Sequence, residues 1–342
     1  MAETVTVSLY QITNCTYASE KPELKNFGKS IDIFEDVSNW VAGLASVGET
    51  TTFEPNEDEP FLRTFCFDIR AIPGTDKMLI ALWNESSNSE DELQTLEMTA
   101  AIGTADVSNL RIQPGSLPGY AAYFVVSPKD ESLINLRFEN RLNGSKPFAR
   151  YVLGFLERES SYCHYDPTDG ERLLGYAPEG DAPSTDHTPV FKYQLMRRPG
   201  SIDWLRQQCS NIRKIIRRTI VYPKVVEHKP FFDGARKFLG LSQNNRLKSG
   251  IKFEYSYKTR LGEEELDMVI DECLDRIEEN SWEDVGFIMA KSAGKIHWLS
   301  GSYAREKSTI TVRRTMGGII DTADLADQLS LDIDRLISEA QK

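Results

Sequence analysis

Lysine and arginine side chains are concentrated in one central stretch of the chain, and phosphate groups are ligands that such a cluster binds well. Residues 192–260 carry 17 basic against 4 acidic residues, whereas residues 1–186 carry 14 against 30 and residues 261–342 carry 9 against 18. The formal net charge of −12 therefore conceals a basic segment between two acidic flanks. This asymmetry is typical of a surface that faces a polyanion.

We predict that residues 192–260, the basic segment, bind the phosphate backbone of DNA with little base specificity, and that release of counterions supplies the affinity. The predicted contact residues are Arg197, Arg198, Arg206, Arg213, Lys214, Arg217, Arg218, Lys224, Lys229, Arg236 and Lys237. Four aromatic residues among the cations could stack on bases, but core packing is the better explanation for each of them. They are Tyr222, Phe231, Phe232 and Tyr257.

Two local geometries are open for these cations. If the helix predicted from residue 201 continued through the basic run, Arg206, Arg213 and Arg217 would share one face. If the run is a strand, alternation separates Arg213 and Arg217 from Lys214 and Arg218, and only one pair can contact a ligand.

The competing interpretation is that the cations form ion pairs with the acidic flanks, inside the molecule or across a dimer interface. It has a clear basis, because 48 of the 52 acidic residues lie outside the basic segment. In that case the chain would be a protein-interaction sensor, and its acidic first lobe would contact the partner.

No catalytic motif is recognisable, so we expect no enzyme, no cofactor and no metal site. The four histidines are dispersed, and the sequence contains neither a P-loop nor a dinucleotide-binding fingerprint. A metal-dependent nuclease is the enzymatic alternative, and it would need carboxylates beside a bound phosphodiester. Glu254 with Lys258, and Asp233 with Arg236 and Lys237, are the nearest approach to that arrangement.

Composition and length indicate a soluble protein of more than one compact part. With 342 residues, two lobes or one domain with a large insertion are the natural expectations. Five scattered cysteines without a Cys-x-x-Cys pair favour a reducing compartment, and no apolar run is long enough to cross a bilayer. We therefore expect a cytoplasmic protein that does not insert into a membrane.

Hydrophobic periodicity predicts an α+β fold of two lobes, each with a mainly antiparallel sheet and packed helices. We predict an N-terminal acidic lobe over residues 1–160, a linker over 161–189 and a C-terminal lobe over 190–342. The linker prediction depends on a stretch rich in proline and glycine and poor in apolar residues.

In the first lobe, the predicted strands are residues 4–12, 61–69, 78–83, 120–126 and 133–138. The predicted helices are residues 31–47 with Ser30 as N-cap, a short helix after an acidic loop at residues 84–97, and residues 145–157 with Ser145 as N-cap.

In the second lobe, the predicted strands are residues 190–196, 215–226, 251–257, 285–290, 295–299 and 309–312. The predicted helices are residues 201–211, 231–241, 263–280 and 324–340, the last with Thr322 as N-cap.

The order of these elements resembles the RexA phage-exclusion family of temperate bacteriophages. The segments that carry the resemblance are residues 30–34 (SIDIF), 118–126 (PGYAAYFVV), 136–140 (LRFEN), 195–198 (LMRR) and 230–240 (PFFDGARKFLG). The resemblance implies a DNA-binding homodimer of two lobes that senses infection beside a membrane effector protein. The chain is also similar to ring-forming nucleoid proteins of the RdgC type, which would place the cations on an inner DNA-facing surface.

Overall fold

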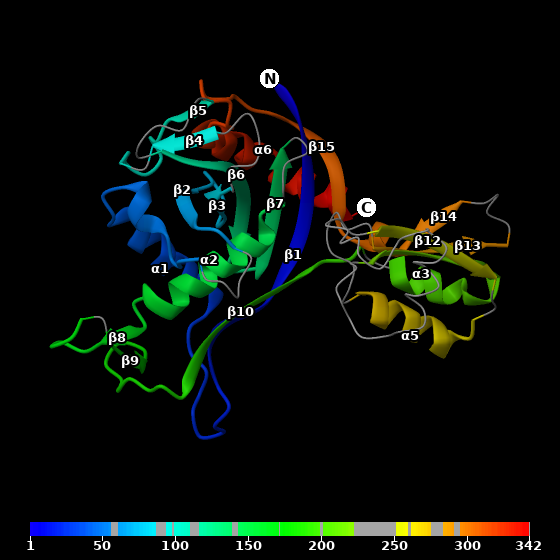
Figure 1. Cartoon of the computed structure of the whole chain (residues 1–342), viewed down its shortest axis with the longest axis horizontal. Helices are drawn as coiled ribbons and strands as arrows, with labels where there is room; N and C mark the ends of the chain where they lie inside the picture. Colours follow the sequence, from blue (N-terminus) through cyan, green and yellow to red (C-terminus); the bar gives the residue numbers. More distant parts are fainter. Residues whose placement is uncertain are drawn as a thin grey trace, which may run out of the picture. The chain divides into compact units, whose positions relative to one another are not determined.

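A computed structural model describes residues 1–55, 61–86, 94–97, 99–109, 116–138, 143–170, 172–198, 201–221, 251–258, 261–274, 283–290 and 295–341. These residues form an α+β fold of two compact units, each with an antiparallel sheet and packed helices, as predicted (Figure 1). The large unit comprises Met1–Met196 and Ala304–Lys342, and the small unit comprises Arg197–Tyr303.

The large unit is built on a sheet in the order β10-β1-β7-β6-β3-β2, and all of its described strand pairs are antiparallel. Its strands are β1 (Ala2–Ser19), β2 (Thr64–Ala71), β3 (Met78–Glu85), β4 (Gln94–Glu97), β5 (Val107–Asn109), β6 (Ser116–Ser127), β7 (Ser132–Phe138), β10 (His187–Leu195) and β15 (Arg305–Thr311). The five strands predicted in the first lobe are therefore confirmed, with shifted ends.

Helices cover both faces of this sheet because its strands alternate their side chains between two cores. Helices α1 (Ser30–Ala42) and α2 (Ser145–Arg158) pack on the face that carries Ile80 and Leu82. Helix α6 (Thr322–Gln341) packs on the face that carries Trp83. The sheet is thus the middle layer of the large unit.

Several predicted helix ends are wrong. Helix α1 ends at Ala42 instead of residue 47, with Gly43 as its C-cap residue. Residue 29 holds the N-cap position of α1, and Gly144, at a φ of 70°, holds that of α2, so neither predicted serine is a cap. In α6, Asp321 Oδ1 accepts the N–H groups of residues 323 and 324, at 3.0 and 3.1 Å, and is the cap in place of Thr322.

The short helix predicted after the acidic loop is also wrong, because the described residues 99–109 form turns and strand β5. Within the predicted loop, residues 94–97 form strand β4. Their backbone groups pair with β5 on one side and with β6 on the other. Pairing with neighbouring strands, and not local composition, therefore determines the conformation of this segment.

The division of the chain differs from the predicted one. Residues 161–189 hold the small hairpin of β8 (Cys163–Tyr165) and β9 (Leu173–Tyr176) and the start of β10, all within the large unit. After the small unit the chain returns to the large unit in β15 and α6. The small unit is thus an insertion into the large one, and the prolines and glycines of residues 161–189 belong to a folded part of the large unit.

The insertion interrupts what would otherwise be a single edge strand. β10 pairs with β1 up to Leu195 opposite Tyr10, and β15 continues along the same edge of β1 from Arg305 opposite Ser8 (Figure 1). Between them, Met196 N–H donates to the Leu9 carbonyl at 2.7 Å, and Leu9 N–H donates to the Ala304 carbonyl at 3.0 Å. Two residues, one on each side of the insertion, therefore share one position of the strand.

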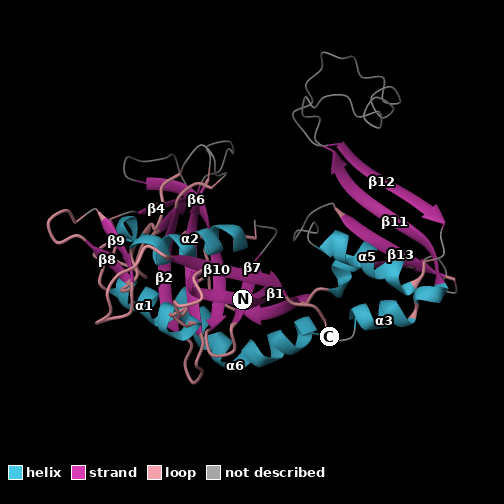
Figure 2. Ribbon diagram, turned by 90° about the horizontal axis from the view of Figure 1, so that it is seen from below, coloured by secondary structure: helices cyan, strands magenta, loops and turns pink. Residues whose placement is uncertain are grey.

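In its described residues, the small unit has a four-stranded antiparallel sheet in the order β12-β11-β13-β14 and two α-helices. Its elements are α3 (Ser201–Gln207), β11 (Ile212–Val221), β12 (Ile251–Lys258), α5 (Glu263–Leu274), β13 (Asp284–Met289) and β14 (Ile296–Trp298). Figure 2 shows both helices on one side of the sheet. There Leu205 of α3 and Leu266 of α5 pack against Ile215 and Phe287.

The predicted second-lobe elements are present where the structure describes them, with shifted ends, but strand 190–196 (β10) and helix 324–340 (α6) belong to the large unit. Helix 201–211 ends at Gln207 and is followed by a 3₁₀ turn at Cys209–Asn211, and strand 309–312 belongs to the large sheet as β15. Residues 222–226 and 275–280 of two predicted elements, and all of the predicted helix 231–241, lie outside the described residues. None of the described helices is long and apolar enough to cross a membrane.

Candidate nucleic-acid interface

The basic run that begins at Arg213 lies on strand β11, so the helical alternative for these cations is wrong and the strand alternative holds. A bulge between Ile212 and Lys214 sets the register with β13. After this bulge Ile215 faces α3 and α5, and Arg217 shares that side because it lies opposite buried Val285. Lys214 and Arg218 point to the other side of the sheet.

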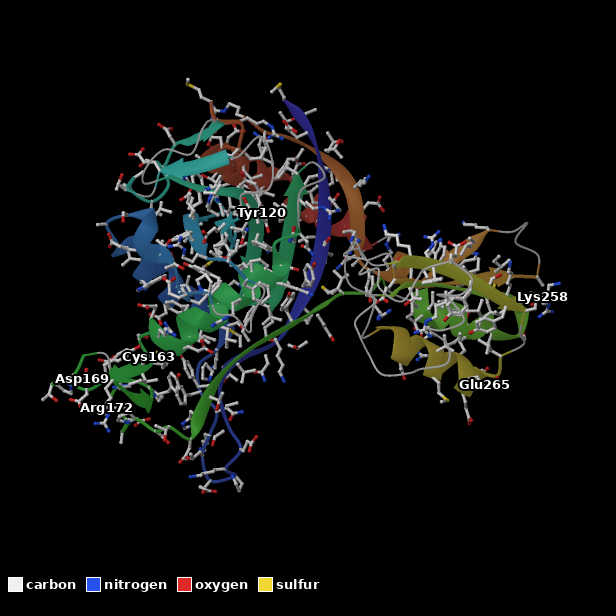
Figure 3. All side chains as sticks on the ribbon, viewed as in Figure 1. Tyr120, Cys163, Asp169, Arg172, Lys258 and Glu265 are labelled. Carbon is white, nitrogen blue, oxygen red and sulfur yellow. The ribbon has the colours of Figure 1, made fainter. Side chains whose placement is uncertain are left out.

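Cross-strand pairing gathers four cations on that other side. Lys214 lies opposite Lys258, Arg218 lies opposite Glu254, and residue 220 lies opposite Lys252. Figure 3 labels Lys258 on this unit and Glu265 on the helix side. We call this side the open face, because no helix in the described part of the small unit packs on it. Its polar and aromatic members are Lys214, Arg218, Lys252, Glu254, Ser256, Lys258, Asp284 and Trp298.

The pair of Lys214 and Lys258 is the least compensated part of the open face. Within the described residues, neither side chain has an acidic partner. Like charges directly opposite each other on neighbouring strands destabilise a sheet. A bound anion such as a phosphate would relieve this repulsion, since it could accept hydrogen bonds from both ammonium groups.

Arg218 is in a different environment, because carboxylates flank it on both sides. Its Nε atom lies 2.7 Å from Glu254 Oε2, and Asp284 is its cross-strand partner on β13. Its guanidinium carbon lies 3.9 Å from the centre of the Trp298 ring. Burial raises the pKa of Asp284, while hydrogen bonds from the Ser300 N–H and hydroxyl act in the opposite direction.

Three of the predicted contact residues are engaged elsewhere. Arg206 forms ion pairs with Asp267, at 2.7 Å, and with Asp203, at 3.3 Å, so the competing interpretation holds for this residue. Arg213 donates to the carbonyls of residues 210 and 212, at 2.8 and 3.2 Å. The guanidinium of Arg197 lies over the Tyr303 ring at 5.0 Å.

The remaining predicted contacts divide into two groups. Arg217 lies on the helix side of the sheet, and Arg198 is half-buried before α3. Lys224, Lys229, Arg236 and Lys237 lie outside the described residues, as do Tyr222, Phe231 and Phe232. Tyr257 is on the helix side, and 44% of its surface is exposed. The structure therefore brings Lys214 and Arg218 together and separates both from Arg217, while Arg213 lies in the bulge and donates to backbone carbonyls.

Three residues of the open face that could contact a ligand, Lys252, Lys258 and Trp298, were not among the predicted contacts. Lys252 and Lys258 were counted in the basic segment, and the alternating pattern of residues 251–257 already put Lys252 on a polar face. Trp298 lies beyond the basic segment and reaches this face only through the pairing of β14 with β13. No local pattern could have identified it.

Carboxylates for metal catalysis are not gathered in the described part of the chain. No group of three or more histidine, cysteine, aspartate or glutamate side chains there is placed to hold a metal ion. Glu254, the best carboxylate of the nuclease alternative, forms an ion pair with Arg218. Burial raises the pKa of the Cys163 thiol to about 12, which leaves it a poor nucleophile.

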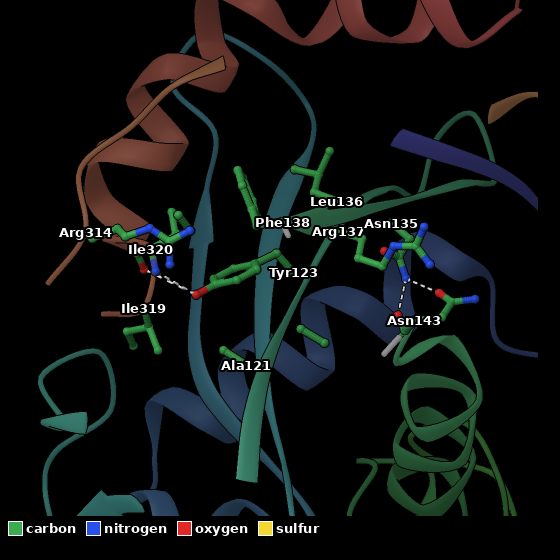
Figure 4. Close-up of a pocket in the computed structure, with 11 residues that line it drawn as sticks. Ala121, Tyr123, Asn135, Leu136, Arg137, Phe138, Asn143, Arg314, Ile319 and Ile320 are labelled. Carbon is green, nitrogen blue, oxygen red and sulfur yellow. Dashed lines mark hydrogen bonds between the residues drawn. The ribbon is translucent and has the colours of Figure 1, made fainter. Parts of the chain in front are cut away.

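A small cavity lies in the large unit where β6 and β7 separate beyond the Tyr123–Leu136 pair (Figure 4). Tyr123 accepts a hydrogen bond from the Ile320 N–H at 3.0 Å, and Asn135 donates to the Asn143 side-chain oxygen at 2.6 Å. With a volume of about 20 Å³, the cavity has room for about one water molecule. It is too small for a substrate.

A wider open depression of about 920 Å³ lies beside the end of α2. Tyr165 and Tyr176, which line it, donate to the last-turn carbonyls of Arg158, at 2.7 Å, and Glu157, at 3.3 Å. These tyrosines satisfy carbonyls that a helix end leaves without partners. Their hydroxyls therefore have a structural role.

Comparison with known proteins found no match to a family model and no curated protein with significant sequence similarity.

Proposed function

We propose that this chain is a non-enzymatic DNA-binding protein whose small unit contacts the phosphate backbone through the open face. The observation that carries the proposal is the cross-strand pair of Lys214 and Lys258, for which the described residues supply no acidic partner. A sheet that places two ammonium groups opposite each other loses stability unless an anion lies between them. A phosphate diester supplies that anion.

The arrangement favours backbone binding over base readout. Its lysines donate from flexible ammonium groups, which satisfy phosphate oxygens without selecting a base. The described open face presents a broad sheet, with neither a helix nor a two-stranded ribbon that would enter the major groove. Affinity would then come mainly from counterion release and depend little on sequence.

The biological setting is part of the same proposal and is supported by the resemblance to the RexA family. We place the chain in a phage-exclusion or other antiphage defence system, as a sensor or regulator that acts in the cytoplasm. It would act there as a homodimer, with a membrane effector protein as its partner.

Fluorescence anisotropy of labelled DNA of several unrelated sequences, measured across a salt titration, tests this proposal. Three or four phosphate contacts predict a slope of log affinity against log salt between roughly −2 and −4, similar for every sequence. Affinity that depends strongly on sequence, or binding that is absent at low salt, would reject the backbone mechanism. In the second case a protein ligand would replace DNA as the candidate.

A further inference from the structure

The Trp298 ring lies across a glycine of the neighbouring strand. Trp298 and Gly286 are cross-strand partners on β14 and β13. A Cβ atom at residue 286 would lie 2.8 Å from Cε3 and 3.0 Å from Cζ3 of the tryptophan ring, closer than carbon atoms approach without a clash. The ring and the Ile296 side chain, which would lie closer still, together occupy the space that a side chain at residue 286 would need. The ring thus lies over β13, on the side where Arg218 of β11 contacts it.

Arg218 of β11 meets this ring with its guanidinium. The separation of 3.9 Å between the guanidinium carbon and the ring centre is that of a stacked cation–π contact. The ion pair of Arg218 Nε with Glu254 at 2.7 Å holds the guanidinium from the other side. An arginine fixed in this way has lost much of its freedom before any ligand binds.

The charge of Arg218 is largely compensated, but part of its surface stays accessible. Glu254 pairs with it directly, Asp284 is its cross-strand neighbour, and 30% of its side-chain surface is exposed. A compensated guanidinium attracts a phosphate less strongly than the uncompensated Lys214 and Lys258 do. Its flat face can still stack on a nucleobase, which is the second way in which arginine recognises nucleic acids.

We infer that Arg218, stacked on Trp298, is a platform for an unpaired nucleobase, so that the DNA bound at the open face is single-stranded. This inference rests on the proposed function. A duplex keeps its bases stacked on one another and offers this face only phosphates, whereas a single strand can add a base to the platform.

The spacing of the cations along the sheet agrees with this assignment. Lys214 is four residues from Arg218 on β11, or about 13 Å, and Lys252 is six residues from Lys258 on β12, or about 20 Å. The lysine pair therefore lies on one side of the platform along the strands, and Lys252 lies on the other. A single strand that follows β11 can place phosphates at both ends and a base at the centre.

Three labelled DNAs of equal length test the inference with the full chain: an oligo-dT strand, a strand of the same phosphates without bases, and a duplex. We expect oligo-dT to bind about tenfold more tightly than the abasic strand, because a base stacked on such a platform contributes that much. Arg218→Lys keeps the charge and removes the plane, so it should lower oligo-dT affinity by about the same factor and lower abasic-strand affinity much less.

The outcomes separate this inference from the proposed function. Equal affinity of the unsubstituted protein for the oligo-dT and abasic strands would overturn the platform, whether or not Arg218→Lys folds. If Lys214→Ala/Lys258→Ala then still lowered binding to every DNA, the backbone proposal would stand without the platform. No binding of any DNA at low salt would overturn both.

Discussion

At the scale of single residues, the open face holds two kinds of cation. Lys214 and Lys258 face each other without an acidic partner in the described part of the chain, whereas Arg218 is held between carboxylates and an aromatic ring. Residues kept in an unfavourable arrangement often mark a functional site, because the ligand removes the cost. The two kinds of cation should therefore respond differently to substitution.

Lys258→Glu should make the folded protein more stable while it weakens DNA binding. The substitution replaces a like-charge pair across β11 and β12 by an opposite-charge pair, worth roughly 0.2–1 kcal/mol in the free energy of unfolding. Urea denaturation measures the gain, and anisotropy with labelled DNA measures the loss. Lower stability with unchanged binding would show that Lys258 supports the fold and is not part of a DNA site.

Asp284 should give the small unit a measurable pH dependence. Burial raises the pKa of this carboxyl above its ordinary value of 3.8, so the folded protein keeps the proton at pH values where the unfolded chain has lost it. The contribution of Asp284 to the free energy of unfolding therefore falls as pH rises from below 3.8 through the raised pKa.

Asp284→Asn removes this titration, since an amide has no acidic proton in that range. The difference in urea midpoint, variant minus unsubstituted protein, should increase as pH is raised from about 3 to about 6. Losses of stability at low pH that both proteins share cancel in this difference. A difference that decreases over the same interval would mean that the hydrogen bonds from Ser300 outweigh burial and lower the pKa.

At the scale of the elements, tyrosines close the end of α2. Tyr17 on β1 donates to the buried Leu156 carbonyl at 2.8 Å, and Tyr165 on β8 donates to the exposed Arg158 carbonyl at 2.7 Å. Helix-end carbonyls need partners when water cannot reach them. The buried hydroxyl should therefore matter more than the exposed one.

Tyr17→Phe should lower the free energy of unfolding by about 1 kcal/mol, because it removes a buried hydrogen bond. Tyr165→Phe is the matched control, and it should cost much less since water can replace the lost donor at an exposed site. Thermal unfolding compares the two variants. Equal losses would indicate that water reaches both carbonyls alike.

Elements with a strong periodic pattern could be predicted from the sequence. The strand at residues 4–12 and the hairpin around residues 73–76 follow from alternation and turn residues, and both are present. The predictions at residues 94–97 and 161–189 failed to anticipate pairing with distant strands. Local composition does not contain that information, because a strand is stabilised by its neighbours.

The candidate site could be predicted only in part. Charge counting identified the basic segment, and alternation predicted that only one of two pairs of its cations could contact a ligand. Which pair that is depends on the bulge between Ile212 and Lys214 and on the register with β13. Arg206 forms ion pairs with two acidic residues, one of them on another helix. This tertiary contact could not be predicted from the sequence, so Arg206 was included among the predicted DNA contacts.

At the scale of the whole molecule, the small unit is inserted into one edge strand of the large sheet. Met196 supplies the N–H group and Ala304 supplies the carbonyl that pair with Leu9, as a single residue would in an uninterrupted strand. Insertions at such sites leave the host unit able to fold, since its own contacts do not pass through the insert.

A chain without residues 197–304, in which Met196 directly precedes Arg305, should therefore fold. One residue would then make both hydrogen bonds to Leu9, and the register of β10 and β15 on β1 would be kept. Circular dichroism and cooperative thermal unfolding test the fold, and the shortened chain should not bind DNA. An unfolded product would show that the large unit depends on its insertion.

The central claim is that the open face, and not the basic segment as a whole, contacts DNA. The most direct test compares Lys214→Ala/Lys258→Ala with Arg213→Ala/Arg217→Ala by anisotropy on one labelled DNA across a salt titration. Both variants lose two positive charges from the same unit, but both lysines lie on the open face, whereas Arg217 lies on the helix side and Arg213, in the bulge, donates to two backbone carbonyls. We predict that the lysine variant loses most of its affinity for DNA. Its slope of log affinity against log salt should become less steep by the amount expected for the loss of about two phosphate contacts, while the arginine variant stays close to the unsubstituted protein. Equal losses in the two variants, or a larger loss in the arginine variant, would contradict the account.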